Sequence, residues 1–316
     1  MGHSRDAILG GFIYRRVAAL PLASPCQSER RRKPAGGRLS VLGRSQLAFA
    51  FLVGQNKREV LTVSGLETMK PDYGNWVPKK LLYVPGALGV LCLGLSLPFP
   101  PLLVGATACI GSFVYFAYAR YQFSPRGGDI QARIQRLVLD RLDWDGEGRA
   151  LDIGCGNGPL TVRLAQKFPN GRVTGIDCWG GKWEYSQSVC EKNAELEGVA
   201  GRVDFRKASA AALPFEDESF DAAVSNLVFH EVSDAKDKRD VIKEALRVVK
   251  KGGKFAFQDL FHVKTMYGEV DDLLEAMRSW GIESVEFLDT SEANFIPKAL
   301  RLPFMVGTIG ILYGTK

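Results

Sequence analysis

The hydrophobic positions of residues 130–316 follow two alternating patterns. Short apolar runs, which are typical of buried strands, alternate with segments whose apolar residues recur every three or four positions, as in amphipathic helices. Strands are predicted at 149–154, 172–177, 203–208, 220–226, 252–260, 284–291 and 307–316, and helices at 134–142, 160–168, 183–196, 240–250 and 270–281. This alternation predicts an α/β fold with a parallel sheet covered by helices on both faces. No helix separates the last two strands, so the seventh strand is expected to be inserted antiparallel, as a hairpin partner of the sixth.

Two uncharged apolar runs precede this region, at 81–97 and 101–119. Their lengths are at the lower limit for crossing a hydrocarbon core of about 30 Å. Basic residues flank the pair at both ends: Lys79, Lys80, Arg120 and Arg126. Five aromatic residues are expected near the membrane interface at the same end: Trp76, Tyr83, Tyr115, Tyr118 and Tyr121. The pattern predicts a two-helix transmembrane hairpin, within an anchor at 69–122, whose two ends face the cytoplasm. A buried hairpin of a soluble protein is the alternative.

The basic charge of the chain is concentrated in residues 1–68. This segment holds 11 of the 41 Lys and Arg residues and four of the 35 acidic residues, so the rest of the chain has 30 basic and 31 acidic residues. The formal charge of +6 therefore gives the main body no signature of nucleic-acid binding. Residues 1–68 are expected to be a disordered leader or a misassigned sequence upstream of a true start at Met69. A transit or targeting peptide is the alternative.

The six cysteines are scattered along the chain without a Cys-x-x-Cys pair or a nearby histidine. This spacing argues against a zinc site and against a disulfide framework, and it fits a reducing compartment. No metal site is predicted.

A glycine-rich segment, LDIGCGNG, follows the first predicted strand. Gly154, Gly156 and Gly158 come after Asp152, at the sheet edge where open α/β folds bind their ligands. Asp177 ends the second strand, where a carboxylate can accept two hydrogen bonds from ribose hydroxyls. Together the two acids disfavour phosphates and favour a cation, so a positively charged nucleoside fits this site better than NAD does.

These motifs resemble those of the class I S-adenosylmethionine-dependent methyltransferases, and the sequence is similar to the ubiquinone/menaquinone-biosynthesis subgroup over roughly residues 130–316. The resemblance implies a Rossmann-like seven-stranded sheet and S-adenosyl-L-methionine as the cofactor. It assigns the cofactor-binding residues Asp152, Gly154, Cys155, Gly156, Gly158, Asp177, Cys178, Trp179, Ser209, Ala210 and Asn226. The chain departs from the family at Ser209, where an Asp commonly contacts the adenine amino group.

Methyl transfer from a sulfonium is an in-line displacement, so alignment supplies much of its acceleration. A base is needed only where the acceptor loses a proton. Asn226 ends the fourth predicted strand and His230 follows it closely; they are the predicted catalytic residues, with His230 as the general base. The alternative is that His230 closes the pocket or caps the next helix. Glu231 is a weaker candidate, and Asp259 and His262 are better explained as strand-end residues.

The resulting hypothesis is a membrane-anchored methyltransferase whose catalytic domain, at 130–316, lies on the cytoplasmic side of a lipid bilayer. Its acceptor is expected to be an apolar or membrane-resident small molecule. The apolar segment 295–307, with two basic residues, is expected to lie at the membrane interface or to pack beneath the hairpin. The main alternative is a non-catalytic S-adenosylmethionine-binding protein with a membrane assembly or regulatory role. An NAD-dependent oxidoreductase is disfavoured, because Pro159 replaces the third glycine of the dinucleotide motif.

Overall fold

The computed structural model describes residues 69–180 and 184–316 of the chain, so the predicted leader at 1–68 lies outside the described residues. The strands are β1 Arg149–Ile153, β2 Arg172–Asp177, β3 Val203–Lys207, β4 Phe220–Asn226, β5 Val249–Asp259, β6 Ser284–Asp289 and β7 Gly310–Thr315. The α-helices are α1 Lys80–Leu95, α2 Leu102–Phe123, α3 Ile130–Arg141, α4 Pro159–Lys167, α5 Gln187–Leu196, α6 Lys238–Arg247, α7 Lys264–Tyr267 and α8 Val270–Ser279. Short 3-10 helices are η1 Ala200–Arg202, η2 Phe229–Glu231 and η3 Lys298–Leu300.

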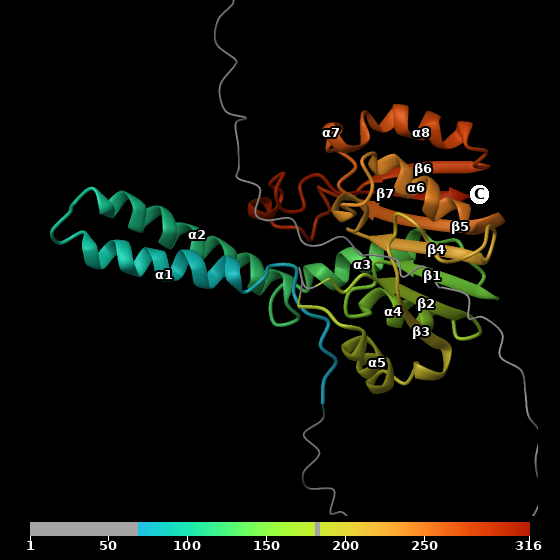
Figure 1. The fold of residues 1–316 in the computed structure, drawn as a ribbon, viewed down its shortest axis with the longest axis horizontal. Helices are drawn as coiled ribbons and strands as arrows, with labels where there is room; N and C mark the ends of the chain where they lie inside the picture. Colours follow the sequence, from blue (N-terminus) through green and yellow to red (C-terminus); the bar gives the residue numbers. More distant parts are fainter. Residues whose placement is uncertain (1–68, 181–183) are drawn as a thin grey trace, which may run out of the picture.

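The strands form one seven-stranded sheet in the order β3-β2-β1-β4-β5-β7-β6 (Figure 1). Neighbouring strands from β1 to β5 are parallel, whereas β7 pairs antiparallel with both β5 and β6. The predicted Rossmann-like sheet is therefore confirmed, as is the antiparallel last strand. Strand order reverses between β1 and β4, which places the carboxyl ends of these strands at the position where open α/β sheets bind ligands.

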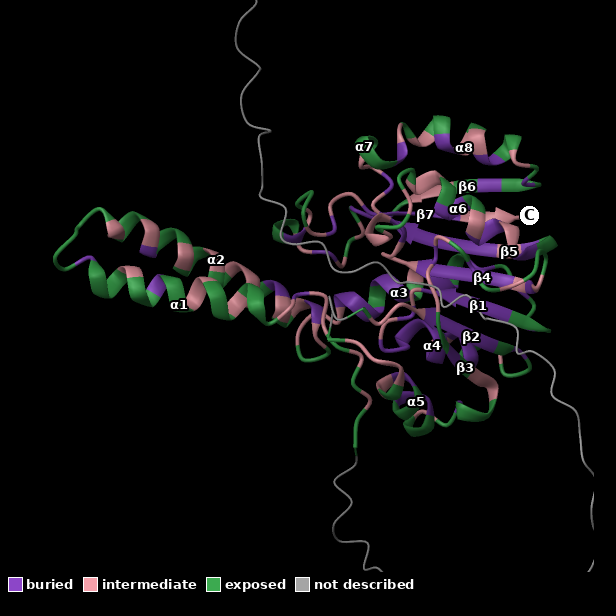
Figure 2. Ribbon diagram, in the orientation of Figure 1, coloured by how far each residue is buried: buried purple, intermediate pink, exposed green. Residues whose placement is uncertain are grey.

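Apolar residues fill both faces of the sheet, because alternate side chains of a strand point in opposite directions. In β1, Leu151 and Ile153 belong to the core formed with α6 and α8, whereas Ala150 belongs to the core formed with α3, α4 and α5. Figure 2 shows the central strands as buried. Asp152 shares the second face with Ala150, so a carboxyl is buried among these apolar side chains.

Several element boundaries differ by a few residues from those predicted, and two of these differences have a clear local cause. Strand β5 begins at Val249, whereas the sequence pattern placed it after a helix that continues to residue 250. Val249 pairs with Phe220 of β4, and β-branched residues suit a strand better than a helix end. Helix α5 begins at Gln187, because the Ser186 hydroxyl accepts a hydrogen bond from the Val189 amide and caps the helix there.

The two apolar runs form antiparallel helices, α1 and α2, that project from the α/β domain (Figure 1). Much of their surface is exposed (Figure 2). Among the described residues, α2 is the one helix long and apolar enough to cross a membrane, and 11% of its apolar window is buried. A core helix of a soluble protein would be mostly buried, so the predicted alternative of a buried hairpin does not describe this arrangement. Helix α1, with 16 residues, is shorter.

A third apolar cluster joins the base of the hairpin to the domain. Ala119 and Phe123 of α2 pack with Ile130 and Ile134 of α3. Ile296, Leu300, Val306 and Ile309, from the segment between β6 and β7, complete this cluster. The expectation that the segment 295–307 packs beneath the hairpin is therefore met.

Candidate active site

The glycine-rich loop connects β1 to α4 and is held against the end of β2. The amides of Gly154 and Cys155 donate to the carbonyl of Ile176 at 2.8 and 2.9 Å, and the Gly156 amide donates to Asp177 Oδ2 at 2.9 Å. Gly154, Gly156 and Gly158 all have positive φ, at 73°, 59° and 79°. Residues with a Cβ are strained in this region, which explains the alternate glycines.

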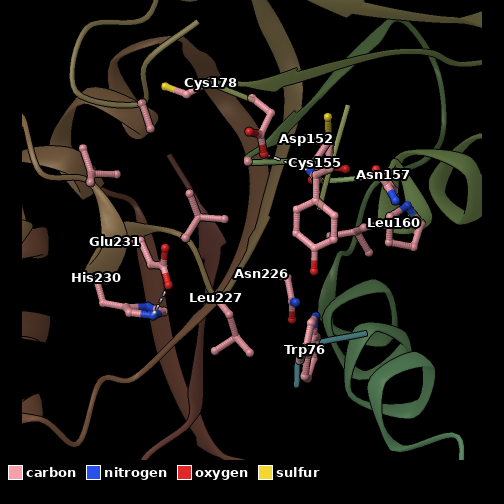
Figure 3. A pocket seen from close by; sticks show the side chains of 18 of the residues that line it. Trp76, Asp152, Cys155, Asn157, Leu160, Cys178, Asn226, Leu227, His230 and Glu231 are labelled. Carbon is pink, nitrogen blue, oxygen red and sulfur yellow. Dashed lines mark hydrogen bonds and ion pairs between the residues drawn. The ribbon is translucent and has the colours of Figure 1, made fainter. Parts of the chain in front are cut away.

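A cavity of about 470 Å³ lies between this loop, the ends of β1, β2 and β4, and the base of the hairpin. Its size is within the usual range for small-molecule sites. All the predicted site residues line the cavity except Gly158. Gly158 instead precedes α4 as its N-cap, and a side chain there would contact Phe205 and Cys190. Figure 3 shows Asp152 and Cys155 at one side of the cavity, His230 and Glu231 at another, and Asn226 beside Trp76.

Two carboxyl groups, those of Asp152 and Asp177, make the part of the cavity beside the glycine loop acidic. Burial raises the pKa of Asp152 to about 7, although the Thr161 hydroxyl donates to its Oδ2 at 2.6 Å and opposes the shift. Burial also raises the pKa of Asp177, and the amides of Trp179 and Gly156 oppose that shift. Among the residues that the structure describes, neither carboxyl has a cationic side chain as a hydrogen-bond partner. A cation in the cavity would relieve the cost of ionising both groups.

The residues after Asp177 form one wall of this part of the cavity. The Trp179 amide donates to Asp177 Oδ1 at 2.8 Å, and its indole Nε1 donates to the Gly156 carbonyl at 2.9 Å. Cys178 Sγ donates to the carbonyl of Ala208 at 3.3 Å. The indole is therefore fixed on the glycine loop, where its ring forms a flat apolar surface beside the Asp177 carboxylate.

An acidic residue stands beside Ser209, at the position where the family commonly has Asp. The Ser209 hydroxyl donates to Asp234 Oδ2 at 3.2 Å, and both residues line the cavity. Asp234 belongs to a mixed charge run after β4 that gives no signal of a binding site in the sequence. It was missed because 25 residues separate it from Ser209.

Asn226, the last residue of β4, has an unsatisfied acceptor in the cavity. Its Oδ1 is buried and has no hydrogen-bond partner among the described residues. Burying an acceptor without a hydrogen bond costs free energy, and a ligand that supplies a donor would remove this cost. The next residue, Leu227, has a φ of 58°, which is uncommon for a non-glycine residue. Strained backbone of this kind is concentrated at functional sites, and Leu227 lines the cavity.

His230 is held by a buried carboxylate. Its Nδ1 lies 2.7 Å from Oδ1 of Asp259, which ends β5 and is fully buried. Asp259 Oδ2 also accepts the amides of Val228 and Phe229, at 3.0 and 2.7 Å. We assign the Nδ1 proton to this hydrogen bond, which makes Nε2 the basic nitrogen. Nε2 lies 3.9 Å from Oε1 of Glu231. Asp259 is thus both a strand-end residue and a positioning residue for His230.

His262 takes no part in this arrangement. It does not line the cavity, and its Nε2 lies 3.1 Å from Oδ2 of Asp289. Among the described residues, no cluster of three or more His, Cys, Asp or Glu side chains is arranged to hold a metal ion.

A segment preceding the hairpin, residues 72–77, covers the glycine loop, and we call it the strap. The carbonyl of Asp72 accepts from Asn157 Nδ2 at 3.2 Å and from Asn193 Nδ2 at 2.9 Å. Tyr73 and Trp76 line the cavity. Trp76 was expected near a membrane interface, and Tyr73 carries no sequence signal of a site residue. Trp76 instead packs against Phe123, with ring centroids 5.5 Å apart.

Comparison with known proteins identifies the family. Residues 151–257 match the methyltransferase domain family. Over 181 residues the chain is 30% identical to the O-methyltransferase rstn1 of Aspergillus nomiae, an alignment that covers 51% of the chain and 76% of that protein. The chain belongs to the class I S-adenosylmethionine-dependent methyltransferases. The cofactor of this methyltransferase is S-adenosylmethionine, as the motifs of the glycine loop and Asp177 predicted.

Other relatives align over part of their length. The methyltransferase is 31% identical over 175 residues to the biotin biosynthesis bifunctional protein BioHC of Teredinibacter turnerae, covering 50% of the chain and 30% of that protein. It is 38% identical over 110 residues to the demethylmenaquinone methyltransferase of Roseiflexus castenholzii, covering 34% of the chain and 41% of that protein. The chain therefore spans less than half the length of these two relatives.

Proposed function

We propose that this methyltransferase transfers a methyl group from S-adenosylmethionine to an apolar, membrane-resident small molecule. The observation that carries the proposal is the division of the cavity into two chemically different ends. Asp152 and Asp177 make one end acidic, whereas the other end is lined mainly by apolar side chains, with Gln131 as a polar residue beside Trp76. The apolar residues are Trp76, Phe123, Leu227, Leu260 and Val306. His230 lines the same cavity and is held by Asp259. A cationic cofactor suits the first end, and an apolar acceptor suits the second.

The residues of the acidic end fit the cofactor. Asp177 has lone pairs beyond those that accept the two amides, and these can accept ribose hydroxyls. The buried oxygen of Asn226 can accept from an ammonium or hydroxyl group. Bound S-adenosylmethionine supplies an electrophilic methyl group on a sulfonium, a strong donor that needs no metal.

The chain's part in the reaction is alignment and, where the acceptor carries an acidic proton, removal of that proton. Nε2 of His230 takes the proton while Asp259 stabilises the imidazolium that forms. The apolar walls exclude water from the acceptor end, which strengthens the electrostatic attraction between His230 and Asp259.

The membrane location of the acceptor is supported by the position of the hairpin. Phe123 is both the last residue of α2 and part of the cavity wall. The acceptor end is therefore built on the base of an exposed apolar hairpin, whose α2 is long enough to cross a bilayer. The name of the Roseiflexus relative, a demethylmenaquinone methyltransferase, is in keeping with an acceptor of this class.

The experiment uses the full chain in detergent, with S-adenosylmethionine labelled in its methyl group. The acceptor probe is a total lipid extract, with the soluble metabolites of the same cells in a parallel reaction. We expect label in organic-extractable product, and a loss of about 100-fold or more in rate for His230→Gln with unchanged cofactor affinity. Label confined to soluble metabolites would refute the apolar acceptor, and cofactor binding without transfer to either fraction would favour the non-catalytic alternative.

A further inference from the structure

The apolar end of the cavity is bounded by a compact loop at residues 302–305. The carbonyl of Leu302 accepts from the amides of Met305 and Gly307, at 2.9 and 3.1 Å, and Val306 donates to the carbonyl of Leu300. These hydrogen bonds fold the chain back on itself, and the tip of the loop is apolar. Phe304 is 66% exposed. Exposed apolar surface of this kind often marks a site of contact with a ligand, a partner protein or a membrane.

The loop lies beside the domain end of the hairpin (Figure 1). The rings of Phe304 and Tyr115 of α2 are 6.0 Å apart between centroids, and the Tyr115 hydroxyl donates to the Ala299 carbonyl at 3.0 Å. Tyr115 precedes Arg120, the first charged residue of α2, by five positions, or about 7.5 Å along the helix axis. If the hairpin crosses a bilayer, Phe304 therefore lies on the hydrocarbon side of the charged helix end, at the depth of an aromatic belt.

The same loop forms part of the cavity wall. Pro303, Phe304 and Met305 line the cavity together with Phe123. Phe304 is thus exposed next to the hairpin and also in contact with the interior where an acceptor would lie. Phe304 is therefore a residue of the cavity wall that is also exposed at the surface, and its neighbours in the loop, Pro303 and Met305, are apolar as well.

We propose that the loop at 302–305 is the entrance by which the acceptor passes from the bilayer into the cavity. The occupant is a lipid-phase molecule with a polar head that carries the methylated atom and an apolar tail. The head reaches His230, while the tail stays between Phe304, Tyr115 and the surrounding lipid. This inference rests on the proposed function, because it needs the hairpin to lie in a membrane.

The first test is photocrosslinking of the full chain reconstituted in phosphatidylcholine vesicles. Benzoylphenylalanine replaces Phe304, Val104 or Leu196 one at a time. Val104 is 77% exposed on the hairpin, and Leu196, 36% exposed on α5, is the matched control away from it. Mass spectrometry then detects phospholipid adducts after irradiation. We expect adducts at positions 104 and 304 and none at 196.

The outcomes separate the two proposals. An adduct at 104 without one at 304 overturns the entrance and leaves the membrane anchor standing. No adduct at 104 overturns the membrane location, and the entrance with it. Equal adducts at 304 and 196 also overturn the entrance, because they show lipid contact without preference for this loop.

The second test separates an entrance from a simple membrane contact. Phe304→Asp should lower methyl transfer to vesicles of total lipid extract by about tenfold or more, whereas Phe304→Leu should stay within about threefold of wild type. The dissociation constant for S-adenosylmethionine should stay within twofold in both, because Phe304 lies at the apolar end. Leu196→Asp controls for an added surface charge. Wild-type transfer by Phe304→Asp would overturn the entrance, even if the crosslinks form.

Discussion

Replacing Asp152 by Asn is expected to stabilise the cofactor-free protein, and increasingly so as the pH rises. The carboxyl is buried, and its Oδ2 accepts a hydrogen bond from the Thr161 hydroxyl at 2.6 Å. Burial raises its pKa from 3.8 to about 7. An amide oxygen can accept the same hydrogen bond without the cost of ionisation, so the variant removes the titration and keeps the shape.

The magnitude follows from proton linkage. The unfolded carboxyl titrates near pH 3.8 and the folded one near pH 7, so unfolding releases a proton between these values. The stability that the folded protein gains from holding Asp152 protonated is therefore fully present below pH 3.8 and is lost as the pH rises to 7. A shift of about three pKa units corresponds to about 4 kcal/mol. The advantage of Asp152→Asn in free energy of unfolding should grow from about 2 kcal/mol at pH 5 to about 4 kcal/mol at pH 8.

The assay is urea unfolding of the cofactor-stripped protein between pH 5 and 8, followed by circular dichroism. The decisive quantity is how the difference in free energy of unfolding between Asp152→Asn and wild type changes with pH. Any loss of packing in the variant is the same at every pH and does not affect this change. Asp143→Asn is the matched control, since the Asp143 side chain is almost fully exposed. A difference between Asp152→Asn and wild type that stays constant over this range would show that the carboxyl is already ionised in the folded protein, and would refute the reasoning.

Four further predictions concern the site. Asp177→Ala should weaken S-adenosylmethionine binding by about 1.5–3 kcal/mol in calorimetry; unchanged affinity would remove Asp177 from the site. Asp259→Asn should lower turnover by about tenfold or more with cofactor affinity within twofold, because Asp259 positions His230 and lies away from the acidic end; a parallel loss of both would indicate a structural role alone. Asp234→Ala should weaken cofactor binding by about 1 kcal/mol, measured beside the exposed Asp143→Asn. A chain that starts at Met69 keeps the strap and should bind the cofactor as the full chain does, whereas one that starts at Pro78 should bind about tenfold more weakly because it lacks the hydrogen bonds to Asn157 and Asn193.

The parts of the site that lie on the main strands could be predicted from the sequence. A buried strand and a glycine loop are local features, since strand periodicity and positive φ depend on a few adjacent residues. Asp152, Gly156 and Asp177 therefore come out of the sequence in their correct places. The antiparallel β7 also follows from a local observation, the missing helix after β6.

The remaining contacts depend on where distant segments pack. Asp234 reaches Ser209 across 25 residues, and the strap reaches Asn157 across 85. Neither segment has a periodicity or a motif that marks it as part of a pocket. Trp76 shows the difficulty most clearly, because an aromatic residue beside an apolar helix looks the same whether it faces lipid or lines a cavity.

The strap has a practical consequence for making a form of this protein that lacks the exposed hairpin. The strap leads directly into α1, and it contacts the end of α2 at the base of the hairpin. There Asn75 Nδ2 donates to the Arg120 carbonyl at 3.0 Å, and Arg120 Nη1 donates to the Val77 carbonyl. The hairpin is therefore a protrusion with closely spaced ends, of the kind that a domain can lose without losing its own connectivity. Replacing residues 83–114 with a short Gly-Ser linker would remove most of the exposed apolar surface, keep Ala119 in the cluster at the base, and leave Tyr73 and Trp76 in the cavity wall. A chain that begins after the hairpin would lack the strap as well, so Tyr73 and Trp76 would be missing from the cavity wall.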